Sequence, residues 1–84
     1  MRVYMQIPAL DDKPSRYYQL LLLEDLIDGW TLIREWGPLG RAGRIKRDHF
    51  DSHDAAQDAL LRVRNTQLKR GFKVVFMQGQ DQPV

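Results

Sequence analysis

Cysteine is absent from this sequence of 84 residues, which excludes a disulfide framework and any metal site built on thiolates. Long apolar segments are absent as well. Apolar runs such as residues 20–23 are far shorter than the roughly 20 residues that cross a bilayer. The N-terminal residues also lack the apolar stretch of a signal peptide. We therefore expect a cytoplasmic protein that does not enter a membrane.

Signatures of catalysis are missing too. Gly37, Gly40 and Gly43 have the wrong spacing for a dinucleotide fingerprint, and there is no Gly-Lys-Ser or Gly-Lys-Thr phosphate loop. Neither Ser15 nor Ser52 has an evident histidine–acid partner that would make it a nucleophile. We expect a protein that is not an enzyme, with no catalytic residue and no cofactor.

His49 and His53 lie four residues apart among acidic residues, and two interpretations are open. Their nitrogens, with neighbouring carboxylates, could hold a metal ion. The interpretation we favour is a polar strand end followed by a capped helix start, because the helix is expected to begin between the two histidines. We therefore expect no metal site.

What the sequence does contain indicates one folded domain over residues 1–84. Its hydrophobic fraction is 43%, and it has two Trp, three Tyr and three Phe. The net charge of +2 is small, but residues 59–80 contain no acid and five cations. A second cluster without acids consists of Arg41, Arg44, Lys46 and Arg47. Such segregation can give a nearly neutral protein one cationic face.

Four segments in the first part of the chain have the pattern of strands. Residues 3–7 alternate and end at Pro8, and residues 17–23 form an apolar run that predicts the most buried strand, because four successive leucines leave no polar face. Asp28-Gly29 predicts a two-residue hairpin turn into a strand over residues 30–36. A glycine-containing turn over residues 37–43 leads to a fourth strand over residues 44–50.

A helix is predicted to follow, because Asp51 and Ser52 are good N-cap residues and Gly71 is a natural stop. Its apolar stripe at helical spacing consists of Ala56, Ala59, Leu60 and Val63. Residues 72–76 alternate as a last strand, with Phe72, Val74 and Phe76 on one face, and residues 79–84 are expected to form a loose tail. The predicted class is α+β, a single small domain with an antiparallel sheet of four to five strands and one helix packed on one face.

The two tryptophans are the most informative residues. On a strand, Trp30 and Trp36 share one face with Arg34 between them, because side chains alternate with period two. We expect Trp30 to pack in the core, whereas core and surface positions remain equally open for Trp36. Arg34 could stack on Trp36 as a cation–π pair. The second tryptophan runs directly into an arginine-rich hairpin, and exposed aromatic surface beside cations suits nucleic acid.

The chain resembles the WGR domain, a module of poly(ADP-ribose) polymerases and of small bacterial proteins that is named for its Trp-Gly-Arg motif. The resemblance covers residues 16–76 and agrees with the predicted sheet and helix. It is carried by Tyr17-Tyr18, Trp30, Arg34, Trp36-Gly37, Gly40, Phe50-Asp51-Ser52, Ala56 and Lys69-Arg70-Gly71-Phe72.

The resemblance implies a role at broken DNA. In the polymerases the motif tryptophan packs against the terminal nucleotide, while basic groups hold phosphates. Here Trp36 and Gly37 match the motif, but Pro38 stands where the family has arginine. That arginine also communicates with neighbouring polymerase domains, so this relay is not expected here. Arg41 offers a cation nearby, on the hairpin.

Our functional hypothesis is a module that binds nucleic acid, most favourably DNA and its strand ends, and that is a monomer. Its expected contact residues are Trp36, Arg34, Arg41, Arg44, Lys46 and Arg47. The four hairpin cations Arg41, Arg44, Lys46 and Arg47 could instead keep an edge strand soluble. The alternative function is a protein-interaction or adaptor domain that uses an apolar sheet face or edge, because one helix can cover only one face.

Overall fold

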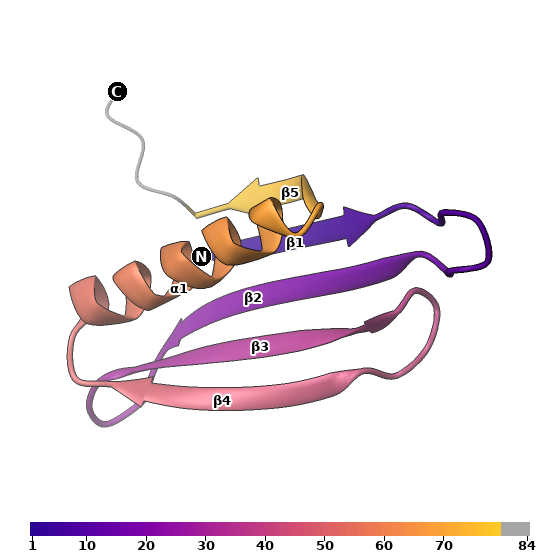
Figure 1. Cartoon of the computed structure of the whole chain (residues 1–84). Helices are drawn as coiled ribbons and strands as arrows, with labels where there is room; N and C mark the ends of the chain where they lie inside the picture. The colour runs from indigo at the N-terminus through magenta and orange to yellow at the C-terminus, as the bar shows by residue number, and fades with distance from the viewer. Residues whose placement is uncertain (80–84) are drawn as a thin grey trace.

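Residues 1–79 are described by the structure, a computed structural model in which a five-stranded antiparallel sheet carries one helix on one face (Figure 1). The strands are β1 (Arg2–Ile7), β2 (Arg16–Glu24), β3 (Trp30–Pro38), β4 (Arg44–Phe50) and β5 (Lys73–Gln78), and the helix is α1 (His53–Lys69). The order across the sheet is β4-β3-β2-β1-β5, so β5 joins the edge of β1 after α1 has crossed the sheet. The predicted α+β class is confirmed.

The core lies between α1 and one face of the sheet. Because α1 approaches the sheet through the small side chain of Ala56 and through Leu60, both of these residues are completely buried. The buried cluster consists of Val3 and Met5 from β1, Tyr18, Leu20 and Leu22 from β2, Leu32 from β3, and Ala56 and Leu60 from α1. Burial of these apolar side chains is the main force holding the helix to the sheet.

β2 has more buried residues than any other strand of the described chain, as the apolar run predicts, although α1 covers only one of its faces. Leu20 and Leu22 are buried beneath α1, whereas Leu21 is half-buried and Leu23 is 46% exposed on the other face. Leu21 and Leu23 stay more accessible because the described part of the chain supplies one helix for two sheet faces.

The turn between β2 and β3 is wider than the expected two-residue turn at Asp28-Gly29. The register of the two strands leaves five residues, 25–29, between them. The Asp25 N–H donates to the Gly29 carbonyl at 2.9 Å, and Gly29 has a φ of +90°. Thr31 Oγ1 donates to Asp25 Oδ1 at 2.7 Å, which closes the wider loop.

α1 begins and ends at the residues that its capping signals predict. Ser52 Oγ accepts a hydrogen bond from the Ala55 N–H at 3.1 Å. Gly71 follows the C-cap residue with a φ of +106°, a conformation that glycine adopts without strain. The predicted apolar stripe faces the sheet, with Ala56 and Leu60 buried and Ala59 and Val63 partly buried.

The alternation of β5 is interrupted by a bulge. Val74 pairs with Met5 on the helix-bearing face, whereas Phe76 pairs with Tyr4 on the opposite face. The expectation that Phe72, Val74 and Phe76 share one face is therefore wrong for Phe76. The register shift opposite Tyr4 and Met5 inserts one extra residue, which turns the following side chain over.

Within residues 1–79, α1 is not long and apolar enough to span a membrane. Of the loose tail predicted over residues 79–84, residues 80–84 lie outside the described part of the chain.

Candidate nucleic-acid interface

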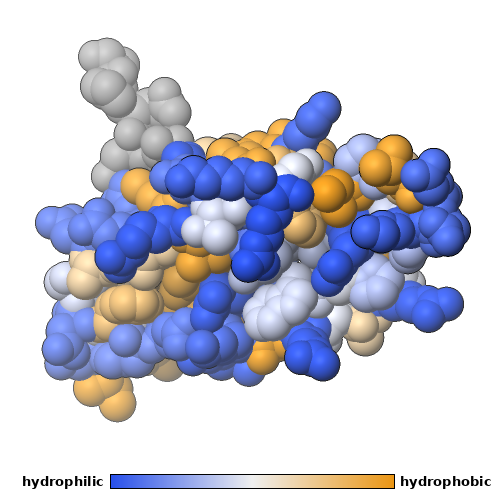
Figure 2. All heavy atoms as spheres, in the orientation of Figure 1, coloured by the Kyte–Doolittle hydropathy of each residue, from blue (hydrophilic) through white to orange (hydrophobic). Residues whose placement is uncertain are grey.

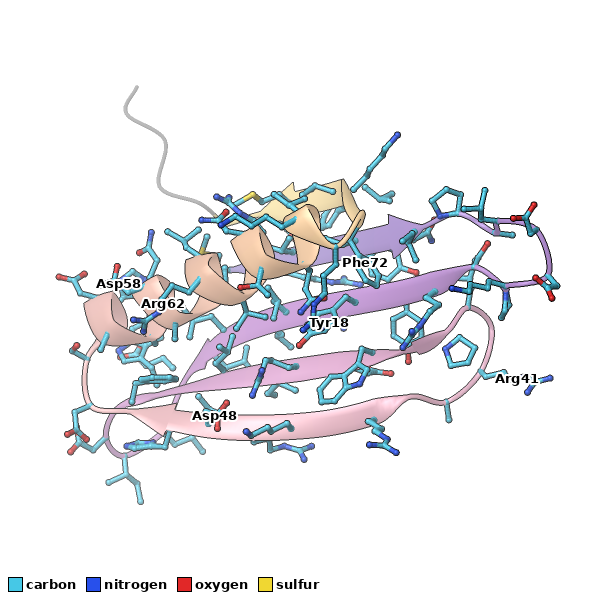
Figure 3. All side chains as sticks on the ribbon, in the orientation of Figure 1. Tyr18, Arg41, Asp48, Asp58, Arg62 and Phe72 are labelled. Carbon is cyan, nitrogen blue, oxygen red and sulfur yellow. The ribbon has the colours of Figure 1, made fainter. Side chains whose placement is uncertain are left out.

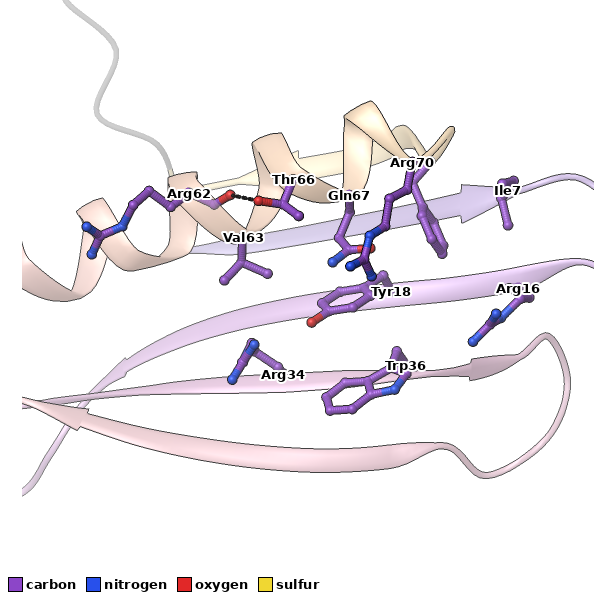
Figure 4. Close-up of a pocket in the computed structure, with 11 residues that line it drawn as sticks. Ile7, Arg16, Tyr18, Arg34, Trp36, Arg62, Val63, Thr66, Gln67 and Arg70 are labelled. Carbon is purple, nitrogen blue, oxygen red and sulfur yellow. Dashed lines mark hydrogen bonds between the residues drawn. The ribbon is translucent and has the colours of Figure 1, made fainter.

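Trp36 and Tyr18 form a stacked pair on the helix-bearing face of the sheet (Figure 4). They are direct neighbours across β3 and β2, with ring centroids 5.5 Å apart and an angle of 11° between the planes. Tyr18 is buried, and its ring meets the Phe72 ring edge-on, with the two ring centroids 6.0 Å apart. The indole of Trp36 is half-buried, so it is fixed in orientation while part of it stays accessible to a ligand.

Trp30 lies at the other end of β3 and packs against the core, as expected. Its ring meets the ring of His53 at 4.7 Å and an angle of 71°. His49 takes a different partner, because its Nδ1 lies 3.0 Å from Asp25 Oδ2. The two histidines thus support separate contacts, one at the helix start and one at the β2–β3 turn.

A pocket of about 600 Å³ opens beside the stacked pair, between the C-terminal half of α1 and strands β2 and β3. Its lining includes four arginines, Arg16, Arg34, Arg62 and Arg70, and no acidic residue of the described chain. We call it the arginine pocket. Figure 2 shows hydrophilic side chains covering much of this face of the molecule. Guanidinium groups bind phosphates and carboxylates with paired hydrogen bonds, so the pocket suits an anion that also carries a flat or apolar part.

Arg34 is the deepest of these cations and is partly neutralised. Its Nη2 donates to Asp48 Oδ2 at 3.2 Å, and the two side chains are 20% and 35% exposed. Its Nε is buried and finds no acceptor among residues 1–79. The partners that the structure gives are therefore Asp48 for Arg34 and Tyr18 for Trp36, in place of the expected cation–π pair between Arg34 and Trp36.

Arg44 and Lys46 extend the cationic surface outward along β4. In the sheet register Arg44 pairs with Trp36 and Lys46 pairs with Arg34, so all four residues occupy the helix-bearing face. Arg44 also lines a second pocket of about 480 Å³, together with Arg16, Trp36 and residues of the β3–β4 turn. Trp36 and Arg16 border both pockets.

The other two expected contact residues lie elsewhere. Arg41 is exposed in the β3–β4 turn, where Figure 3 shows it pointing away from the end of the sheet. Arg47 pairs with Ile33 and therefore faces the side of the sheet that α1 does not cover. The structure thus brings Trp36, Arg34, Arg44 and Lys46 together and separates Arg47 from them, since side chains one residue apart on a strand point to opposite faces.

Sequence reasoning missed three arginines of the pocket. Arg62 and Arg70 suit the negative end of the helix without any ligand, and Arg16 belongs to no recognisable motif. A signal was available for the helical pair: Arg62, Thr66 and Arg70 follow one another at intervals of four residues, which places them along one helix face. No local signal connects Arg16 with them.

The hairpin that carries the site depends on a close approach of two glycines. A Cβ on Gly43 would collide with the carbonyl oxygen of Trp36, and a Cβ on Gly37 would lie 2.9 Å from Gly43 Cα.

On the face of the sheet that α1 does not cover, the Tyr17 hydroxyl donates to Glu35 Oε2 at 2.7 Å. This hydrogen bond to a carboxylate raises the pKa of Tyr17 above its ordinary value, and desolvation adds to the effect.

An antiparallel sheet crossed by one helix, with an aromatic pair and cations on the helix-bearing face, defines a small binding domain. The chain belongs to the WGR domain family, whose model matches residues 1–78. This family consists of binding domains, and in poly(ADP-ribose) polymerases they bind nucleic acid. The chain is also similar to the uncharacterized protein y4dW of Sinorhizobium fredii (strain NBRC 101917 / NGR234), with 26% identity over 72 residues. That match covers 86% of this chain and 35% of the relative, so the chain spans about a third of the relative's length.

Proposed function

We propose that this domain binds DNA and prefers its strand ends, with the arginine pocket and Trp36 as the contact site. The observation that carries the proposal is the combination of an oriented, half-accessible indole with four arginines in one pocket that has no acidic lining. A terminal nucleotide offers both features that such a pocket can use, a planar base and an adjacent phosphate.

The contact residues divide into two roles. Trp36 packs against the base or sugar at the end of a strand, which an internal nucleotide in a duplex cannot offer in the same way. Arg34 and the other pocket arginines hold the phosphates nearest the end, and Arg44 and Lys46 follow the backbone away from it. Arg41 extends from the hairpin toward flanking phosphates. Arg47 faces the other side of the sheet and takes no part in this surface.

The experiment compares a blunt, 5′-phosphorylated duplex with a covalently closed dumbbell of the same sequence as competitors for a labelled duplex. The open duplex should compete more effectively, because the dumbbell has no free ends. Trp36→Leu should reduce binding of the open duplex about tenfold, since stacking on an aromatic ring contributes about 1–3 kcal/mol per base. Arg44→Ala should weaken binding of both competitors equally.

Trp30→Leu is the matched control, because Trp30 is also half-buried on the same face but at the opposite end of β3. It should leave DNA binding unchanged, provided that circular dichroism shows all variants folded. Equal competition by duplex and dumbbell, or equal losses for the two tryptophan variants, would contradict the recognition of strand ends.

The uncovered sheet face supports the protein-interaction alternative less well. Leu23, Ile45 and Phe76 are partly exposed there, but polar groups interrupt them. The guanidinium of Arg2 lies 5.6 Å from the centre of the Phe76 ring and also donates to Gln19 at 3.0 Å. A divided surface of this kind is a poorer docking site than a continuous apolar patch.

A further inference from the structure

The tip of the β2–β3 turn exposes two adjacent large apolar side chains. Leu26 and Ile27 are fully exposed, at 104% and 98%. Single apolar residues on a surface are common, but a neighbouring pair with no contact to the protein contributes nothing to folding. Polar residues would close this turn equally well, so the pair is available for a contact with another molecule.

The turn holds this apolar tip in a fixed position. Asp25 anchors it three times: its N–H donates to the Gly29 carbonyl at 2.9 Å, and its carboxylate accepts from Thr31 at 2.7 Å and lies 3.0 Å from His49 Nδ1. Binding by a fixed tip loses less conformational entropy than binding by a loose loop.

The charges around the tip limit the kinds of surface to which it can bind. Glu24 and Asp28 flank the two apolar residues and are exposed, and no cation lies between residues 24 and 29. These acids oppose contact with nucleic acid or with an anionic membrane. They favour a protein surface that combines an apolar or aromatic hollow with a basic rim.

The arginine pocket of this same chain has that combination, with Trp36 and Phe72 inside and Arg16, Arg62 and Arg70 around them. The tip cannot reach its own pocket. It lies beside Trp30, whereas the pocket is at Trp36, about 20 Å further along the same strand. The contact must therefore be between molecules.

We propose that the tip at residues 24–28 docks into the arginine pocket of a second copy of this chain. The contact joins two different surfaces, so each bound copy leaves a free tip and a free pocket, and further copies can add head to tail. A five-residue tip buries much less than the roughly 1,200 Å² of a stable interface, so a dissociation constant of about 0.1–1 mM is expected. Such a protein is a monomer when dilute, as the sequence led us to expect, and associates when concentrated.

The first test is sedimentation velocity of the full chain over a range of concentrations up to about 2 mM, a limit set by the expected affinity. The average mass should rise with concentration and fall again with added salt, because the contact includes opposite charges. The double variant Leu26→Ser/Ile27→Ser should remain a monomer throughout. The matched control is Ile45→Ser/Val75→Ser, which alters two aliphatic residues that are 52% and 59% exposed elsewhere, and it should associate like the parent.

The second test mixes two variants, neither of which should self-associate when it is alone. The tip variant Leu26→Ser/Ile27→Ser keeps its pocket, and the pocket variant Arg16→Ala/Arg70→Ala keeps its tip. Their mixture should form a dimer that contains one copy of each variant. No larger species should form, because this dimer has neither a free intact tip nor a free intact pocket. A parent protein that stays monomeric, or a mixture that forms no dimer, would overturn the proposal.

Measurements of DNA binding show whether a negative result contradicts this inference or the proposed function, which uses the same pocket. The tip variant should bind the open duplex at least as tightly as the parent, and saturating duplex should dissociate the parent's assemblies because both ligands use one pocket. If self-association fails while DNA binding persists, only the head-to-tail contact is refuted. If assemblies form and respond to both variants but DNA does not bind, only the proposed function is refuted.

Discussion

At the residue scale, the balance of charge in the arginine pocket depends on Asp48. This carboxylate pairs at 3.2 Å with Arg34, which lines the proposed site. Its presence reduces the attraction of the pocket for phosphate, since each opposite charge a few ångströms away offsets part of the field of a guanidinium. The pair also holds Arg34 in place beside the indole, so Asp48 affects both affinity and structure.

Asp48→Asn should therefore strengthen DNA binding several-fold while lowering the free energy of unfolding by only about 1 kcal/mol, because the pair is partly exposed. Fluorescence anisotropy of labelled duplex and urea denaturation measure the two effects. Asp51→Asn is the control: its side chain is fully exposed and pairs weakly with His49, so the same change in net charge should alter binding little. Equal gains for the two variants would show that overall charge, and not the pocket, controls affinity.

Tyr17 gives the β2–β3 pair a dependence on alkaline pH. Its hydroxyl donates to Glu35, and this bond holds the pKa of Tyr17 above the ordinary value of about 10. The folded state therefore keeps the proton longer than the unfolded state does. The stabilising contribution is complete below the ordinary pKa and is lost as the pH rises through the raised pKa of the folded state.

Tyr17→Phe removes this contribution at every pH. The parent should be more stable than the variant at neutral pH, and the difference should shrink above about pH 10. Denaturant titrations of both proteins from pH 7 to pH 11 measure it. A difference that stays constant across this range would mean that the hydrogen bond to Glu35 does not contribute.

At the scale of the elements, the hairpin of β3 and β4 depends on the absence of a side chain at Gly43. Gly43→Ala would place a methyl group against the Trp36 carbonyl, so we expect a loss of about 2–4 kcal/mol in the free energy of unfolding. Gly40→Ala is the comparison. Gly40 has a φ of +81°, but apart from Gly40 and its chain neighbours no atom of the described residues lies within 4 Å of the point that a Cβ would occupy, so only about 1 kcal/mol of backbone strain is expected. Thermal or urea denaturation should show the larger loss at Gly43, and the reverse order would contradict the close packing of the hairpin.

The elements themselves were largely readable from local signals. The strand at residues 44–50 and the helix capped by Ser52 lie where alternation and capping predict them, because those signals act within a few residues. The width of the turn before Trp30 and the bulge in β5 were not predicted, since both depend on the register against a partner strand.

The site was predictable only in part, for the same reason. Alternation alone places Trp36, Arg34 and Arg44 within reach of one another once the hairpin is known. The arginine pocket, by contrast, joins Arg16 of β2 with Arg70 after α1, and their proximity follows from the strand order and from the path of the helix across the sheet. No periodicity in the sequence contains that information.

At the scale of the whole molecule, the net charge of +2 includes the contributions of two surfaces with different charge. The helix-bearing face gathers the arginine pocket, Arg44 and Lys46, whereas Glu24 and Asp28 flank an apolar tip at the other end of β3. This separation of the two surfaces underlies both proposals. The arginine pocket attracts phosphates, and the apolar tip at the opposite end has the charges and the apolar side chains to bind the arginine pocket of another copy.

The most direct test of the central claim compares Arg70→Ala with Arg47→Ala. Both arginines are exposed and both changes remove one positive charge, but only Arg70 lines the pocket, while Arg47 faces the other side of the sheet. In binding titrations against the open duplex at several salt concentrations, Arg70→Ala should weaken binding about tenfold and reduce the salt slope by about one unit. Arg47→Ala should change neither. Equal losses from the two variants would show that diffuse positive charge, and not the pocket beside Trp36, attracts the DNA.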